Sequence, residues 1–598
     1  MNLYDERRFI EEYTYAVNDL GAKWTETTTT FKVWAPTAEK VVLALYESGT
    51  AAVNDLIRKV QMEKGESGVW SIVEHGNLNG IYYTFEVTID GKTVEACDPY
   101  ARTTGVNGNR AMILDLASTN PEGWDKDQSP AKDMKYTDVA LYELHVRDFS
   151  IHESSGVSKK HQGKFLGLAE TGTKTAGGES TCLDYLKNLG VTHLHILPMY
   201  DYGTVDEARL DEPQYNWGYD PTNYNVPEGS YSTDPFHGEV RVKEMKQMIK
   251  TLHENGLSVV MDVVYNHVYD ADTFCFNQIV PGYFSRIDEN GVYSNASICG
   301  NDTASEREMV RKYIIDSVMY WIEEYHMDGF RFDLVGLLDV DTVNEIVHTV
   351  HEKYPYIIFY GEGWDMPSNT VRDCKMAIQK NAYLTPGFAY FSDNIRDLLG
   401  GRNAETLGFV SGREGCEAEV AECFMAKTPW CPGPTQTVNY ISCHDDHTFM
   451  DKLRITRPDA SMEELIAMNK LAASVYILAQ GIPFIHAGEE LLRTKVDEQG
   501  NIVKNSYISS DYVNALRWDK LDDPVYKNVS EYYKELIKLR KENAVFRMTT
   551  AEEVEENVRC LKAEDGIVKM EICGEIEICY NAKDAAVEMR KCSGVKKS

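Results

Sequence analysis

The residues best suited to chemistry stand in the short stretch Gly329-Phe-Arg-Phe-Asp333. Alternate side chains of a β-strand face the same way, so Arg331 and Asp333 should point to one side together. A guanidinium beside a carboxylate favours the ionised form, so we expect Arg331 to lower the pKa of Asp333 and keep it ready as a nucleophile. Taken alone, Arg-x-Asp would more often be a structural ion pair.

A second carboxylate, Glu362, follows in Tyr360-Gly-Glu-Gly-Trp-Asp365. Its apolar neighbour Trp364 should raise its pKa, so that Glu362 holds a proton near neutral pH. One ionised and one protonated carboxyl group flanking a bond are the basic equipment for glycoside hydrolysis. Asp445, in Ser442-Cys-His-Asp-Asp-His447, is a third carboxylate that can stabilise positive charge developing on a sugar ring. This chemistry requires no metal or organic cofactor.

Strands that alternate with helices must position these residues. Strands are expected at residues 140–146, 191–197 and 257–262, and helices at 181–189, 237–255 and 305–325. Ser305 and Glu308 have the spacing of a capping box at the start of the third helix. Over roughly 400 residues this alternation predicts an α/β fold, a (β/α)8 TIM barrel whose active site lies at the C-terminal ends of the strands.

Two β-rich segments flank the predicted barrel. Short alternating runs between about residues 24 and 113 predict an N-terminal β-sandwich, and two further runs near the C-terminus predict a few antiparallel strands. We therefore divide the chain into an N-terminal extension (1–18), a β-sandwich (19–120), the catalytic barrel (121–545) and a small C-terminal β domain (546–598).

The composition limits the kinds of partner that the protein can bind. Lys and Arg number 61 against 94 Asp and Glu, a net charge of −33, which argues against nucleic acid or an acidic membrane surface and favours a neutral substrate. The 13 cysteines show no C-x-x-C pair, so we expect reduced thiols. We find no signal peptide and no long apolar run, and we therefore expect a cytoplasmic protein. We also expect a monomer.

Four segments, residues 262–267, 329–333, 360–365 and 442–447, together resemble the four signature regions of glycoside hydrolase family 13, the α-amylase family. The resemblance implies that Asp333 is the nucleophile, Glu362 the acid/base and Asp445 the transition-state stabiliser. It also implies that Arg331, His267 and His444 bind the glucose at the cleavage position, the −1 subsite. Asn266 is expected to help shape the rim, and Trp364 to be a further substrate contact. For His267 the alternative is a core histidine. Asp262 is expected to shape the rim or to make a structural contact.

One further stretch narrows the family. Tyr215-Asn-Trp-Gly-Tyr-Asp-Pro221 resembles the signature of type I pullulanases, which cut α-1,6 branch points in pullulan and α-glucans. By that pattern Tyr219 stacks on the −1 glucose, Asp220 lies beside it and Trp217 lies near the rim. Phe31-Lys-Val-Trp-Ala-Pro36 resembles the carbohydrate-binding module of family 48. The resemblance implies an α-glucan polysaccharide or oligosaccharide substrate, as in pullulan, limit dextrins of starch or glycogen, and a covalent glucosyl–enzyme intermediate.

The sequence departs from the family at Asp446, where Asn is usual. The extra negative charge could raise the pKa of Asp445 or reshape the neighbouring subsite. The family allows a structural calcium ion, whose ligands the sequence does not single out. The alternative functions are an isoamylase-like or amylase/neopullulanase-like hydrolase, and a catalytically silent glucan-binding protein.

Overall fold

The centre of the molecule is a closed barrel of eight parallel strands, as predicted. The computed structural model describes residues 3–592. The strands in barrel order are β10 (Leu141–Leu144), β11 (His193–Ile196), β14 (Ser258–Val263), β15 (Gly329–Phe332), β16 (Ile358–Gly361), β17 (Ala389–Phe391), β18 (Thr437–Asn439) and β19 (Ile482–His486). Every residue of these strands is buried, because helices cover the outside of the barrel and side chains fill the inside.

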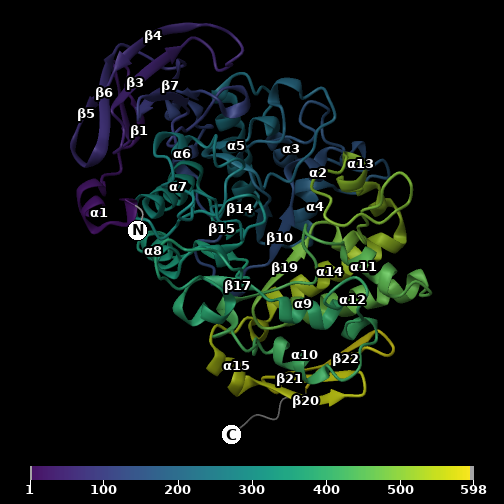
Figure 1. Cartoon of the computed structure of the whole chain (residues 1–598). Coiled ribbons are helices and arrows are strands. Elements are labelled where there is room, and N and C mark those ends of the chain that lie inside the picture. The colour runs from purple at the N-terminus through teal and green to yellow at the C-terminus, as the bar shows by residue number, and fades with distance from the viewer. Residues whose placement is uncertain (1–2, 593–598) are drawn as a thin grey trace.

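Helices follow the strands and cover the barrel (Figure 1). The longer ones are α4 (Cys182–Leu189), α5 (Gly238–Glu254), α7 (Glu308–Tyr325), α8 (Val340–His351), α9 (Asp393–Gly400), α11 (Phe449–Thr456), α12 (Met462–Leu478) and α14 (Pro524–Glu542). Another eight-residue helix, α10 (Glu417–Phe424), and the shorter helices α2 (Val146–Ser150), α3 (Phe165–Ala169), α6 (Cys275–Ile279) and α13 (Asp511–Asn514) lie in the loops. The capping box predicted for α7 is wrong. Ser305 donates a hydrogen bond to Asp339 at 2.7 Å, and α7 begins after Arg307 without a side-chain cap.

The N-terminal region forms two antiparallel sheets. One has the order β1 (Gly21–Trp24), β2 (Thr28–Trp34), β6 (Val69–His75), β5 (Glu63–Lys64), and the other β4 (Leu56–Gln61), β3 (Lys40–Tyr46), β7 (Tyr82–Ile89), β8 (Lys92–Ala96), with β9 (Ala111–Met112) beside β7. Phe31 of one sheet meets Tyr83 of the other with ring centroids 5.1 Å apart. Trp34 and helix α1 (Arg7–Tyr13) pack against Tyr283 of the barrel region and join the sandwich to it.

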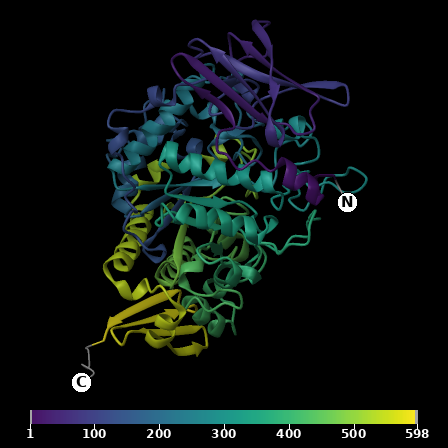
Figure 2. The same ribbon diagram turned by 90° about the vertical axis from the view of Figure 1, so that its left-hand side faces the viewer.

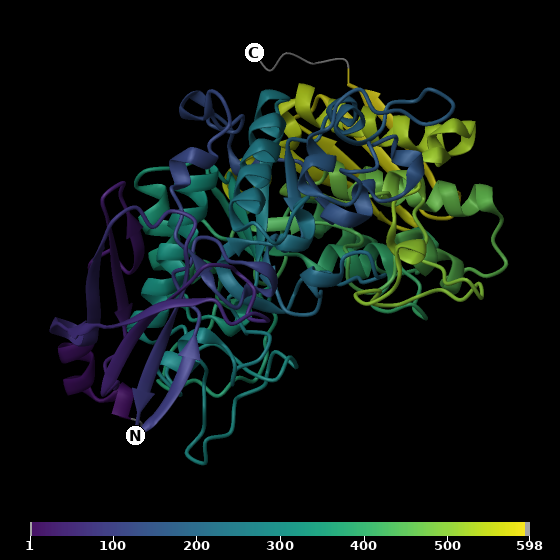
Figure 3. The same ribbon diagram turned by 90° about the horizontal axis from the view of Figure 1, so that it is seen from above.

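The C-terminal region is a single four-stranded antiparallel sheet beside a short helix, α15 (Ala551–Asn557). Its strands are β20 (Val558–Glu564), β21 (Ile567–Ile572), β22 (Ile576–Asn581) and β23 (Ala586–Lys591). Alternate residues of β21 and β22 are buried, because one face of the sheet packs on α10 and α12 and the other does not. Figures 1 and 2 show this sheet and the N-terminal sandwich at opposite ends of the molecule, and the view from above in Figure 3 keeps them apart.

A hairpin after the second barrel strand holds the segment 215–221. Its strands are β12 (Tyr200–Tyr202) and β13 (Pro221–Pro227), and residues 215–220 lead directly into β13. Among the described residues no helix is long and apolar enough to cross a membrane.

Candidate active site

One guanidinium group lies at the centre of the site. Arg331, on β15, is only 1% exposed. Its Nη1 lies 2.9 Å from Asp262 Oδ1 and 3.0 Å from Asp333 Oδ1, and its Nη2 lies 2.9 Å from Glu362 Oε1. These carboxylates come from the ends of the neighbouring strands β14, β15 and β16, which pair in register. Three of the predicted strand ends therefore meet at a single positive charge.

Asp333 is held in place by a second partner. Asn266 Nδ2 donates hydrogen bonds to Asp333 Oδ2 and to its backbone oxygen, both at 2.8 Å. Burial raises the pKa of Asp333 above its usual value, against the lowering by Arg331, and the nearby charge of Asp262 raises it further. The expected lowering of this pKa is therefore wrong, since it considered the guanidinium without the cost of removing the carboxylate from water.

Glu362 has the proton affinity expected of a general acid. Burial raises its pKa to about 7; Arg331 opposes this rise, and the charges of Asp333 and Asp445 add to it. The predicted direction is confirmed. Trp364 lines the same cavity as Glu362, and the Arg396 guanidinium lies 5.9 Å from the centre of the Trp364 ring.

The opposite wall of the site is built from stacked rings. The Tyr219 ring lies on His444 with centroids 4.8 Å apart and planes at 15°. Tyr219 also donates a hydrogen bond to Asp262 Oδ2 at 2.6 Å, and the His444 Nδ1 lies 2.7 Å from Glu143 Oε1. Burial lowers the pKa of His444, but the charges of Asp445 and Glu143 outweigh it and raise the pKa to about 9, so the ring is cationic at neutral pH.

Asp445 is the most accessible of the three candidate catalytic carboxylates. Its side chain is 50% exposed, and its Oδ2 lies 3.6 Å from His444 Nε2. The Asp446 side chain is 64% exposed and pairs with Lys504 at 2.8 Å. The extra charge noted in the sequence thus has its own positive partner.

Other predicted substrate contacts are engaged inside the protein. Both ring nitrogens of His267 lie against oxygen atoms, Asn266 Oδ1 at 2.6 Å and the Tyr219 backbone oxygen at 2.9 Å. Trp217 is 5% exposed and lies edge-on behind His444. The Asp220 backbone oxygen accepts from Gly203 N, and burial raises the pKa of its carboxyl group to about 6. The roles of these three residues toward a substrate stay predictions. In the structure their contacts support the wall formed by Tyr219 and His444.

The sequence reasoning missed two supporting residues. Glu143, on β10, accepts hydrogen bonds from the backbone nitrogen and the ring of His444. His195, on β11, lies 2.9 Å from Asp262 Oδ2. Both interrupt the apolar runs of buried parallel strands, where a charged or imidazole side chain is rare unless it has a partner. These interruptions are the sequence feature that could have identified the two residues.

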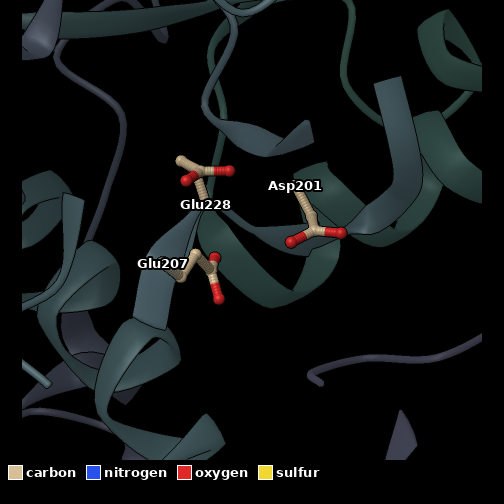
Figure 4. A group of neighbouring side chains, drawn as sticks. All are labelled: Asp201, Glu207 and Glu228. Carbon is tan, nitrogen blue, oxygen red and sulfur yellow. The ribbon is translucent and has the colours of Figure 1, made fainter. Parts of the chain in front are cut away.

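A group of three buried carboxylates lies outside this site. Asp201, Glu207 and Glu228 offer oxygen atoms within 4.8 Å of one another, and Figure 4 shows them around a common space. Oxygen donors suit calcium. However, the Arg241 guanidinium already contacts Glu207 at 2.8 Å and Asp201 at 3.4 Å. Burial, with the charge of Glu207, also raises the pKa of Asp201 to about 7, so a proton can neutralise it. The group does not fit a calcium ion unless Arg241 moves.

Replacing Arg241 with Met should therefore destabilise the protein by about 3–5 kcal/mol, because two buried carboxylates lose their positive partner. Chemical unfolding measures the change. The control Arg209→Met removes an exposed arginine that pairs with Asp206 nearby, and it should leave the midpoint unchanged. We also expect chelation by EDTA to leave the melting temperature unchanged. A large drop would show that a metal ion stabilises the protein, and Glu207 Oε1, which has no hydrogen-bond partner among the described residues, would be a candidate ligand to test by mutation.

Comparison with known proteins agrees with this geometry. Residues 19–101 match the family model "Carbohydrate-binding module 48 (Isoamylase N-terminal domain)", and residues 169–280 match "Alpha amylase, catalytic domain". The chain is 40% identical to the pullulanase of Bacillus subtilis over 97% of its own length and 80% of that protein. It is 31% identical to pullulanase 1 of Arabidopsis thaliana, over 90% of this chain and 68% of that one.

Solved structures give the same result. The pullulanase of Paenibacillus barengoltzii, in complex with maltohexaose and α-cyclodextrin, superposes with a TM-score of 0.93 at 43% identity, covering 97% of this chain and 90% of that chain. The Bacillus subtilis enzyme with maltose gives 0.89 at 39% identity, covering 97% and 80%. A barrel with three converging carboxylates, a family 48 module and these similarities lead to one conclusion: the chain belongs to the type I pullulanases of glycoside hydrolase family 13.

Proposed function

We propose that this chain hydrolyses α-1,6 branch linkages of an α-glucan, with Asp333 as nucleophile, Glu362 as acid/base and Asp445 as transition-state stabiliser. The observation that carries the proposal is that Arg331 holds Asp333 and Glu362 on two nitrogens of one guanidinium, and that burial raises the pKa of Glu362 to about 7. Related pullulanases have been crystallised with maltotriose, maltotetraose and maltohexaose, which supports an α-glucan substrate.

In the first step an oxygen of Asp333 attacks the anomeric carbon of the −1 glucose. The bond from that carbon to the bridging oxygen breaks, and Glu362 donates its proton to the leaving oxygen. The product is a glucosyl ester of Asp333 and a free hydroxyl group on the rest of the glucan. Because both carboxylates contact the same guanidinium, their arrangement favours the short separation of roughly 5–5.5 Å typical of retaining enzymes.

In the second step Glu362, now ionised, takes a proton from water. The water oxygen attacks the anomeric carbon, the ester bond breaks, and Asp333 is released as a carboxylate. Two inversions give retention of configuration. Both transition states carry positive charge on the sugar ring, which the half-exposed Asp445 carboxylate, next to His444, can stabilise.

The bond specificity can be tested by incubating the purified protein with pullulan and separating the products by chromatography. Cleavage of α-1,6 bonds releases maltotriose as the main product. Panose-type products would instead support a neopullulanase-like enzyme that cuts α-1,4 bonds. A folded protein that releases no sugar would support the silent glucan-binding alternative. A monomeric state and a cytoplasmic location stay predictions.

The pH dependence follows from the two carboxyl groups. Above about pH 7 Glu362 loses the proton that it must donate, so kcat/KM on pullulan should fall. At low pH Asp333 takes up a proton and stops acting as a nucleophile, and its raised pKa should move this acid limb above the usual Asp range. Initial rates measured over about pH 4–9 test both limbs. A rate that stays constant up to about pH 9 would contradict the role of Glu362.

A further inference from the structure

An exposed aromatic ring lies next to the wall of the site. Tyr507, in the segment between β19 and α13, is 48% exposed, and its ring centroid lies 6.2 Å from that of Trp217 at 62°. Trp217 in turn lies 4.8 Å from His444 at 86°, with the Lys495 Nζ 5.1 Å from its ring. Trp217 lies among these groups and is only 5% exposed. Tyr507 continues the row of rings outward and offers a face to a ligand.

The backbone beside Tyr507 is hydrogen-bonded to the loop that follows β18. Asp446 N donates to Asn505 Oδ1 at 2.6 Å, and Asn505 N donates to the Asp446 backbone oxygen at 3.1 Å. Both residues have positive φ, +62° and +50°, a conformation that Asp and Asn tolerate better than other side chains. The Lys504–Asp446 ion pair lies at the same place. We call Lys504, Asn505 and Asp446 together the joint.

The next residue adds an anchor on the inner side. Ser506 is fully buried, and its hydroxyl group donates to Asn514 Oδ1 at 2.6 Å while its backbone oxygen accepts from Asn514 Nδ2 at 3.0 Å. The segment is therefore held on both sides immediately before Tyr507. A ring presented by a fixed backbone loses little conformational freedom when it binds a ligand.

The same joint borders the cavity of the active site. A cavity of about 290 Å³ is lined by Glu362, Trp364 and Asp445 together with Asp446 and Asn505. Asn505, which lines this cavity, is two positions before Tyr507 in the chain. Pyranose rings have an apolar face of C–H groups, and exposed aromatic rings are the side chains that cover large apolar area while keeping a polar group for water.

We propose that Tyr507 is a stacking platform for a glucose unit of the α-glucan chain, one or more units away from the glucose at the cleavage position. The proposal rests on the proposed function, because the ligand is the chain whose branch is cut. It gives this side of the site an aromatic ring that is far more exposed than Trp217. The joint formed by Lys504, Asn505 and Asp446 positions the ring.

Replacing Tyr507 with Ala should raise KM for pullulan about threefold to tenfold and lower kcat by a smaller factor, because stacking away from the bond binds ground state and transition state alike. Tyr507→Phe keeps the ring and should restore most of the affinity. The matched control is Tyr512→Ala, which removes a 63% exposed tyrosine from the adjoining helix α13, and it should keep the wild-type KM. Melting temperatures show whether each variant is folded.

Three results would overturn the proposal. They are an unchanged KM and kcat for Tyr507→Ala, an equal rise in KM for Tyr512→Ala, and a lower kcat at constant KM for Tyr507→Ala. The last result would mean that the ring only supports His444. Each of these results counts only if the wild-type enzyme cleaves pullulan to maltotriose. If wild type releases no maltotriose, the proposed function fails first. In that case, binding of maltotetraose by wild type and by Tyr507→Ala, measured by calorimetry, decides whether the platform exists.

Discussion

Asp333→Asn should lower kcat on pullulan by on the order of 10⁴-fold or more, because an amide oxygen is a poor nucleophile and the glucosyl ester cannot form. The fold should survive the change. Asn has the same shape, its oxygen can still accept from Arg331, and that guanidinium keeps Asp262 and Glu362 as ionic partners. Steady-state rates measure the loss, and circular dichroism with thermal unfolding measures the fold.

A carboxylate close to the site in sequence but turned to solvent provides the control. Asp365 is 65% exposed and pairs with Lys380. Asp365→Asn removes the same charge and should keep nearly the full rate. If a folded Asp333→Asn protein retained activity comparable to this control, another group would have to be the nucleophile and the assignment of all three carboxylates would fail.

Glu362→Gln should lower kcat on pullulan by about 10³–10⁴-fold, because a glutamine cannot give a proton to the leaving oxygen. The remaining activity should lose the decrease above about pH 7, since the group with that pKa is gone. Gln can keep an acceptor oxygen toward Arg331, so the geometry around Asp333 should be preserved. Rates as a function of pH for wild type and variant measure both effects.

The leaving group separates this role from a structural one. An aryl α-maltotrioside carries a leaving group that departs without protonation, so formation of its glycosyl ester should be far less sensitive to Glu362→Gln than cleavage of pullulan. A burst of released phenol followed by slow turnover is the expected course, because the second step still lacks its base. Equal losses on both substrates in every phase would indicate that the variant has disturbed the site rather than removed the acid.

The positions of the catalytic candidates followed from the sequence because parallel strands place their C-terminal ends at one rim. Arg331, Asp333 and Glu362 meet in the structure because β15 and β16 pair in register, which the alternation of strands and helices already implied. The four signature segments could be identified without knowing the helices between them. This part of the prediction depended only on regular backbone geometry.

The protonation and support of the site did not follow in the same way. The pKa of Asp333 depends on how deeply the finished barrel buries it and on the charge of Asp262, neither of which is visible in Arg-x-Asp. Glu143 and His195 act through His444 and Asp262, residues far away in the chain. Ser305 has the local spacing of a helix cap, but its hydroxyl group donates a hydrogen bond to Asp339, far away in the chain, instead. Local spacing cannot report such long-range competition.

The most direct test of the account is the anomeric configuration of the first product from pullulan. Digestion in an NMR tube with a large amount of enzyme shows the anomeric proton signals before mutarotation mixes them. The shared guanidinium and the nucleophile Asp333 predict maltotriose that appears first as its α anomer. Maltotriose that appears first as the β anomer would mean direct attack by water, and it would contradict the covalent role of Asp333.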